Sequence, residues 1–265
     1  MSYLDEDSGA EPSGYIGKTF GGVVLAIAIF VGVKFIVPLV MQDAQSPGRI
    51  YTAEAIGAEI EAVAETRETY LAFKTHYPRD YQAFLQRVAQ AANRQRAYEA
   101  ELEARSFLRN FMKSKLVAIS QAPTASLNEI AREYAALAGA LYTEDVALCA
   151  QWATSGFGSN SEPSPAIRAR LNRLVTLQIA AARAGENGAH PPRAALSDGD
   201  LAAWMAGVQS HNPGAARLLR EQRPVDEIPQ TDQCTLSLAL YQGAVDLPPE
   251  ASANVTMELL RGSLS

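Results

Sequence analysis

The stretch "SPAIRARLNRLVTLQIAAA" (residues 164–182) has apolar side chains three or four positions apart. Ile167, Leu171 and Leu174 recur at the spacing that brings side chains to one face of an α-helix. The serine and proline that open the stretch are typical of a helix start. A serine side chain accepts a hydrogen bond from a first-turn amide, and proline lacks an N–H that the first turn leaves unpaired. The stretch therefore predicts a long helix that buries one face.

Helical spacing continues along most of the chain after about residue 50. No run of four or more residues alternates with the β-branched or aromatic content of a strand, so we expect an all-α domain of about eight or nine helices. Thr52 is a predicted N-cap, and "SLNE" (126–129) is a predicted capping box. The expected helices cover 52–77, 79–120, 126–141, 144–154, 164–182 and 197–208, with a short one from 212, one over 231–245 and a last one after 250.

Two loop-like stretches interrupt this pattern, "SGFGSNSEPSP" (155–165) and "GENGAHPPR" (185–193). The first divides the expected domain into a long-helix subdomain (50–155) and a shorter-helix subdomain (164–265), although the two can equally form one domain. The polar middle of the second expected helix, residues 89–105, is predicted to kink or to project from the core.

The N-terminal region reads as a membrane anchor. An acidic tail (1–19) precedes 22 residues with a single charge (20–41), and a linker (42–49) follows. As a helix, 22 residues reach roughly 33 Å, enough to cross a hydrocarbon core of about 30 Å. A cleaved signal peptide would have a basic start and a shorter apolar run. We therefore expect an uncleaved single-pass transmembrane helix.

Lys34 and Pro38 are unusual residues for such a span. One interpretation is that Lys34 bends its side chain toward the nearer membrane surface and keeps its ammonium hydrated. The other is that Lys34 contacts an acidic group of another membrane protein. Pro38 has no N–H, so it leaves the carbonyl of residue 34 without its helical partner and adds polarity at that point.

The two cysteines, Cys149 and Cys234, belong to no metal-binding motif. In an oxidising compartment they are expected to pair, and closing so long a loop would add about 4–5 kcal/mol in the chain-entropy model. The alternative is two buried free thiols in a reducing compartment. We favour the disulfide, and with it a bacterial inner-membrane protein whose N-terminus is cytoplasmic and whose domain is periplasmic.

Residues 87–115 form the most basic part of the chain, with seven lysines and arginines against three glutamates. This surface is expected to contact a protein partner or anionic lipid headgroups. A solvated helix with internal ion pairs is the alternative. The chain as a whole has a formal net charge of −6, which argues against nonspecific nucleic-acid binding. The surface candidates are Arg94, Arg96, Arg105, Arg109, Lys113 and Lys115.

No catalytic motif is recognisable. The three histidines lack zinc-site spacing, no nucleophile elbow is present, and neither a cofactor nor a metal site is expected. Glu129, Glu133 and Glu144 are the helix carboxylates that could act as the acid of a helical cell-wall hydrolase. We expect instead a noncatalytic, membrane-anchored module that binds another envelope or membrane-complex protein. An anchored cell-wall hydrolase or other envelope enzyme is the alternative, and the sequence gives no oligomeric state.

Overall fold

The computed structural model describes residues 50–94, 97–157, 161–188, 190–221, 223–224 and 227–264. The expected transmembrane segment 20–41, with Lys34 and Pro38, lies outside these residues, as does Arg96. Within the part of the chain that is described, every helix is too short or too polar to span a bilayer.

The described residues confirm the all-α prediction, because their regular structure consists of eleven helices and includes no strand. The helices are α3 (Ala53–Ala62), α4 (Arg67–His76), α5 (Pro78–Asn93), α6 (Ala97–Ser120), α7 (Thr124–Glu144), α8 (Val146–Ser155), α9 (Pro165–Asn187), α10 (Asp198–His211), α11 (Pro213–Glu221), α12 (Gln230–Val245) and α13 (Pro249–Leu264).

The expected number of eight or nine helices was too low because two predicted helices are each divided. The first divides at Val63, which is extended, and the Arg67 side chain donates to the carbonyl oxygens of Glu61 at 2.8 Å and Ala62 at 3.4 Å. Those carbonyls are left without amide partners where α3 ends, so Arg67 stabilises the break.

The second division follows Asn93, within the polar stretch where a kink was predicted. The Asn93 side chain pairs with both backbone groups of Tyr51, accepting from its N–H at 2.7 Å and donating to its carbonyl at 2.9 Å. The start of the domain is thereby fixed to the end of α5.

Helix starts follow the sequence signals in most places. Thr52, Ser164 and Ser197 are N-caps whose hydroxyls accept from first-turn amides. The capping box predicted at Ser126 is wrong. Helix α7 begins two residues earlier, at Thr124, because Pro123 supplies an extended backbone and its carbonyl accepts the first helical hydrogen bonds.

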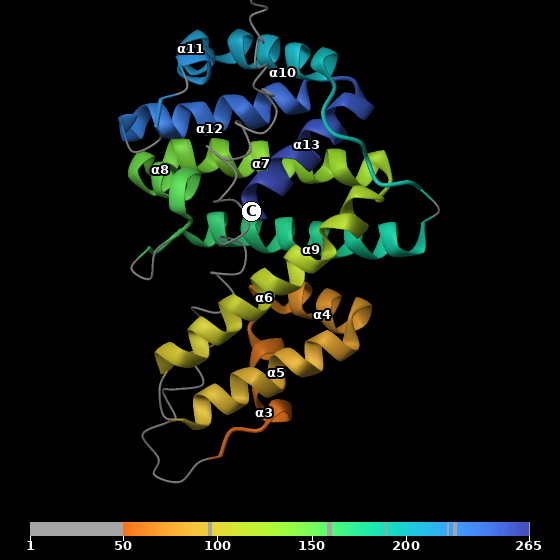
Figure 1. Cartoon of the computed structure of the whole chain (residues 1–265). Coiled ribbons are helices and arrows are strands. Elements are labelled where there is room, and N and C mark those ends of the chain that lie inside the picture. The colour runs from red at the N-terminus through yellow and green to blue at the C-terminus, as the bar shows by residue number, and fades with distance from the viewer. Residues whose placement is uncertain are drawn as a thin grey trace, which may run out of the picture.

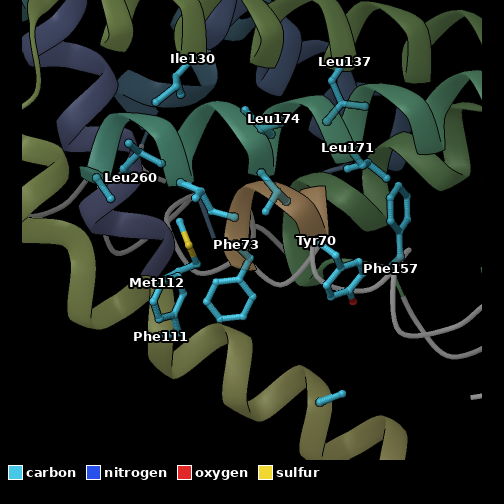
Figure 2. Packing of buried hydrophobic residues seen from close by; sticks show 14 of the residues in the cluster. Tyr70, Phe73, Phe111, Met112, Ile130, Leu137, Phe157, Leu171, Leu174 and Leu260 are labelled. Atoms are coloured by element: carbon cyan, nitrogen blue, oxygen red, sulfur yellow. The ribbon is translucent and has the colours of Figure 1, made fainter. Parts of the chain in front are cut away.

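The helices are stacked from α10 and α11 at one end, through α12, α7 and α9, to α3 and α5 at the other (Figure 1). Helix α9 lies in the middle of the stack. Figure 2 shows Leu171 and Leu174 of α9 between α7 and the aromatic side chains Tyr70 and Phe73 of α4. The apolar face predicted for residues 164–182 therefore forms part of the centre of the main core.

Helix α9 also approaches α6 closely near its C-terminal end. A Cβ atom added to Gly185 would lie 1.7 Å from the carbonyl oxygen of Ala118 in α6. Only a glycine allows the two backbones to come this close. This contact fixes which face of α6 is turned toward α9.

Cys149 of α8 and Cys234 of α12 form a disulfide, with their Cα atoms 5.3 Å apart and a separation of 85 positions in sequence. That separation lies within the usual range for a disulfide, so the predicted pairing is confirmed. Both cysteines are fully buried, and the bond joins helices from either side of the 155–165 loop.

Candidate functional site

The outer face of α6 carries two basic side chains one helical turn apart, Arg109 and Lys113. Both are exposed, and no described residue forms an ion pair with either. The same face has two exposed apolar side chains, Leu102 with 45% and Val117 with 64% of its surface accessible. We call the five exposed side chains that share this face the basic face of α6: Leu102, Ser106, Arg109, Lys113 and Val117.

The opposite side of α6 explains this orientation. Ala104, Phe111 and Met112 are buried in the main core. The ring of Phe111 lies 4.7 Å from that of Phe73 in α4, centroid to centroid. Because these side chains and the close contact at Gly185 fix the rotation of α6, Arg109 and Lys113 are held facing outward.

The other basic residues predicted for this surface lie differently. Arg105 forms an ion pair with Glu101 one turn earlier. The ammonium of Lys115 lies 2.8 Å from Glu186 of α9 and 4.3 Å from the centre of the Tyr77 ring. Arg94 is exposed at the end of α5, beside the Asn93–Tyr51 pair. The structure thus brings Arg109 and Lys113 together and turns Arg105 and Lys115 toward carboxylates of the domain.

Lys115 also affects the acidity of its partner. Burial alone would raise the pKa of Glu186, but the hydrogen bond and the positive charge of Lys115 hold that pKa below its ordinary value. Lys115 and Glu186 are therefore an ion pair that stabilises the contact between α6 and α9.

The three helix carboxylates considered for acid catalysis have different surroundings. Glu133 is 7% exposed and binds two guanidinium groups of α9, Arg170 at 3.0 Å and Arg173 at 3.2 Å. Glu144 accepts the backbone N–H of Ser164 at 3.2 Å, next to the start of α9. Glu129 is exposed. Glu133 and Glu144 thus connect helices of the domain.

A second cluster of polar groups surrounds Arg193, in the extended segment between α9 and α10. Its side chain is 14% exposed. The guanidinium donates to Glu250 at 2.8 Å, to Thr124 at 2.6 Å and to Asn254 at 3.4 Å. A cavity of about 390 Å³ adjoins it, and among the lining residues are His190, Pro191 and Ser120.

Glu250 is the acidic member of this cluster. Its carboxylate accepts from the Thr124 hydroxyl at 2.6 Å and from Arg193 at 2.8 Å, and these hydrogen bonds hold the pKa of Glu250 below its ordinary value. Its side chain is nevertheless 73% exposed. The sequence marked 185–193 only as a loop, because the partners of Arg193 come from helices 69 and 57 positions away.

Among the described residues, no group of three or more His, Cys, Asp or Glu side chains is placed to hold a metal ion. Comparison of the chain with protein families, with curated proteins and with solved structures finds no match in any of the three.

Proposed function

We propose that this chain is a membrane-anchored, noncatalytic helical module that binds another protein of the bacterial cell envelope through the basic face of α6. The observation that carries the proposal is the pair Arg109 and Lys113, which lie one turn apart and have no carboxylate partner among the described residues. Like charges at this spacing destabilise a helix slightly, so the domain itself gains nothing from them.

The chemistry of this face indicates the kind of partner. Two cations favour an acidic surface, and the exposed side chains of Leu102 and Val117 on either side offer apolar contact. Arginine is enriched at protein interfaces, and exposed apolar side chains beside it add area that a partner can bury. The partner is therefore a protein that presents carboxylates between apolar side chains.

The proposed location rests on the expected anchor and on the disulfide. Segment 20–41 would cross the inner membrane with the N-terminus in the cytoplasm, and the linker would place the domain in the periplasm. A bond between Cys149 and Cys234 supports an oxidising compartment, since disulfides persist there and are rare in the cytosol. Lys34 would contact an acidic group of the partner within the membrane.

Crosslinking and purification from intact membranes test the proposal. We expect a specific partner to co-purify with the full-length chain and to be lost from the double variant Arg109→Glu/Lys113→Glu. The matched control is Arg132→Glu on α7, which also changes an exposed arginine with no carboxylate partner among the described residues. Equal recovery of the partner with the double variant and with the control would remove the basic face as the binding surface.

Two further measurements test the role of Lys34 and the periplasmic location of the domain. Lys34→Leu is expected to leave membrane insertion intact and to reduce co-purification; unchanged co-purification would mean that Lys34 only reaches toward the membrane surface. In the native protein we expect no thiol that reacts with an alkylating reagent after denaturation. Two reactive thiols would contradict the periplasmic location.

A further inference from the structure

The cavity beside Arg193 has the size and the polar groups of a small-ligand site. Its volume of about 390 Å³ lies in the range common for such sites. We propose that it binds a small ligand through an oxyanion, either a carboxylate or a phosphate group, for which the Glu250 carboxylate is the internal substitute. The site shares no residue with the basic face of α6, so this proposal and the proposed function can fail separately.

Both backbone polar groups of Arg193 are hydrogen-bonded to other parts of the domain. Its N–H donates to the carbonyl of Ser120 at 3.2 Å, where α6 ends, and its carbonyl accepts from Arg261 of α13 at 2.9 Å. With its backbone fixed and its side chain largely buried, the guanidinium presents a positive charge of fixed position at the cavity.

The contacts of Glu250 show what this site binds. One carboxylate oxygen takes the hydroxyl hydrogen of Thr124, and the other takes an N–H of Arg193. Arg193 also donates to the Thr124 oxygen at 2.6 Å, so the hydroxyl hydrogen is directed away from the guanidinium and toward the carboxylate. A guanidinium and an oriented hydroxyl together form a donor pair for two oxygens of a single acid group.

Glu250 is the exposed member of this cluster. Its side chain is 73% exposed, and ion pairs of exposed carboxylates are held weakly because solvent screens them. When the side chain turns into solvent, Thr124 and Arg193 are free to bind a ligand in its place. Arg193 Nε–H is buried and has no acceptor among the described residues, so one donor of the guanidinium is unpaired inside the domain.

Two other features favour a negative ligand. Helix α7 begins at this cavity, and its N-cap is Pro123, which provides no side-chain cap. The first amides of a helix lack internal acceptors and favour anions. His190 also lines the cavity and can donate a hydrogen bond. These features add to a site whose binding groups are Arg193 and Thr124.

Titration calorimetry on the full-length protein in detergent, at constant ionic strength, tests this inference. The probes are inorganic phosphate and acetate. Glu250→Gln removes the internal competitor and is expected to lower the Kd of at least one probe by ~tenfold, since the binding-competent state becomes the populated one. A gain in affinity cannot come from a variant that fails to fold.

Two variants in the Glu250→Gln background check the binding groups. Arg193→Gln is expected to abolish the gain, and Thr124→Val, which keeps the shape of the side chain, is expected to reduce it. Arg220→Gln is the control for nonspecific attraction, because this α11 arginine hydrogen-bonds Gln209 and lies outside the cavity.

The outcomes are distinct. Tighter binding of phosphate alone assigns a phosphate ligand, of acetate alone a carboxylate ligand, and of both a general oxyanion site. Equal affinity of wild type and Glu250→Gln for both probes would overturn the inference. So would a gain that survives Arg193→Gln.

Discussion

Helices α9 and α6 are the two longest described helices, with 23 and 24 residues, and both are rich in basic side chains. Their basic residues have different partners. All four arginines of α9 have a carboxylate within the domain: Arg168 pairs with Glu65, Arg170 and Arg173 with Glu133, and Arg183 with Glu186. On α6, Arg109 and Lys113 have none among the described residues. Arg168, Arg170 and Arg173 thus tie α9 to other parts of the domain, and Arg183 pairs within α9 itself, whereas Arg109 and Lys113 have no such role among the described residues.

The largest effect on stability is expected at Gly185, because this residue sets how closely α9 packs on α6. In Gly185→Ala the new methyl group would overlap the Ala118 carbonyl, and α9 would have to move. We expect the free energy of unfolding to fall by about 2–4 kcal/mol, at the upper end for overpacking. Urea denaturation followed by circular dichroism measures this change.

A glycine without such a neighbour is the matched control. Around Gly139 of α7 the nearest atom to an added Cβ is a Leu238 methyl at 3.9 Å. Gly139→Ala is expected to stabilise by about 0.5–1 kcal/mol, because alanine is the better helix former. Equal effects of the two substitutions would show that the close approach is not limiting.

Replacing Glu133 tests how much its ion pairs with Arg170 and Arg173 of α9 contribute to stability. Glu133→Gln leaves two guanidinium groups beside a largely buried amide, so a loss of about 1–3 kcal/mol is expected. Both arginines are partly exposed, which keeps the loss below that of a fully buried pair. Chemical denaturation compares it with Glu129→Gln on the same helix, for which we expect a change under about 0.5 kcal/mol.

The ion pair of Lys115 and Glu186, which joins α6 to α9, makes the stability of the domain depend on pH. The folded-state pKa of Glu186 lies below its ordinary value, so the stabilisation is complete above the unfolded-state pKa of about 4.3 and is lost as the pH falls through the folded-state pKa. At pH 7, Glu186→Gln is expected to lose about 0.5–1.5 kcal/mol. The difference from wild type should close as the pH is lowered below 4; a difference independent of pH would exclude the ion pair as its cause.

The smallest effect on stability is expected for the basic face itself. Arg109→Gln/Lys113→Gln should change the free energy of unfolding by less than about 0.5 kcal/mol, with a slight gain from relieving repulsion. Arg168→Gln on α9 loses two hydrogen bonds to Glu65 and one to the Pro163 carbonyl, so about 1–2 kcal/mol is expected. A loss above about 1 kcal/mol for the double variant would mean that these two side chains support the fold.

Local signals in the sequence were enough for much of the fold. Thr52, Ser164 and Ser197 act within three residues of the amides that they cap, so their roles can be read directly from the sequence. The cysteine pair was predictable because the chain has two cysteines and one possible pairing. The break at 63–66 was not, since it has no proline or glycine and is stabilised by the Arg67 side chain.

The candidate sites depended on contacts that the sequence does not display. Arg105 pairs with Glu101 on α6 itself, a spacing that the sequence does display, whereas the partner of Lys115 lies on α9 and depends on how the two helices pack. The partners of Arg193 are brought to it by the packing of α7 and α13. A charge run predicts that a helix is basic, but tertiary packing decides which of its charges remain unpaired.

The bond between Cys149 and Cys234 makes a covalent ring of the chain that connects them, and this ring contains α9, α10, α11 and the Arg193 segment. A protease that cuts once in the segment 190–197 would therefore release no fragment. The two resulting polypeptides would migrate as one species on a gel until a reductant separates them. The domain can thus be cleaved once beside the cavity at Arg193 and still remain a single covalent molecule.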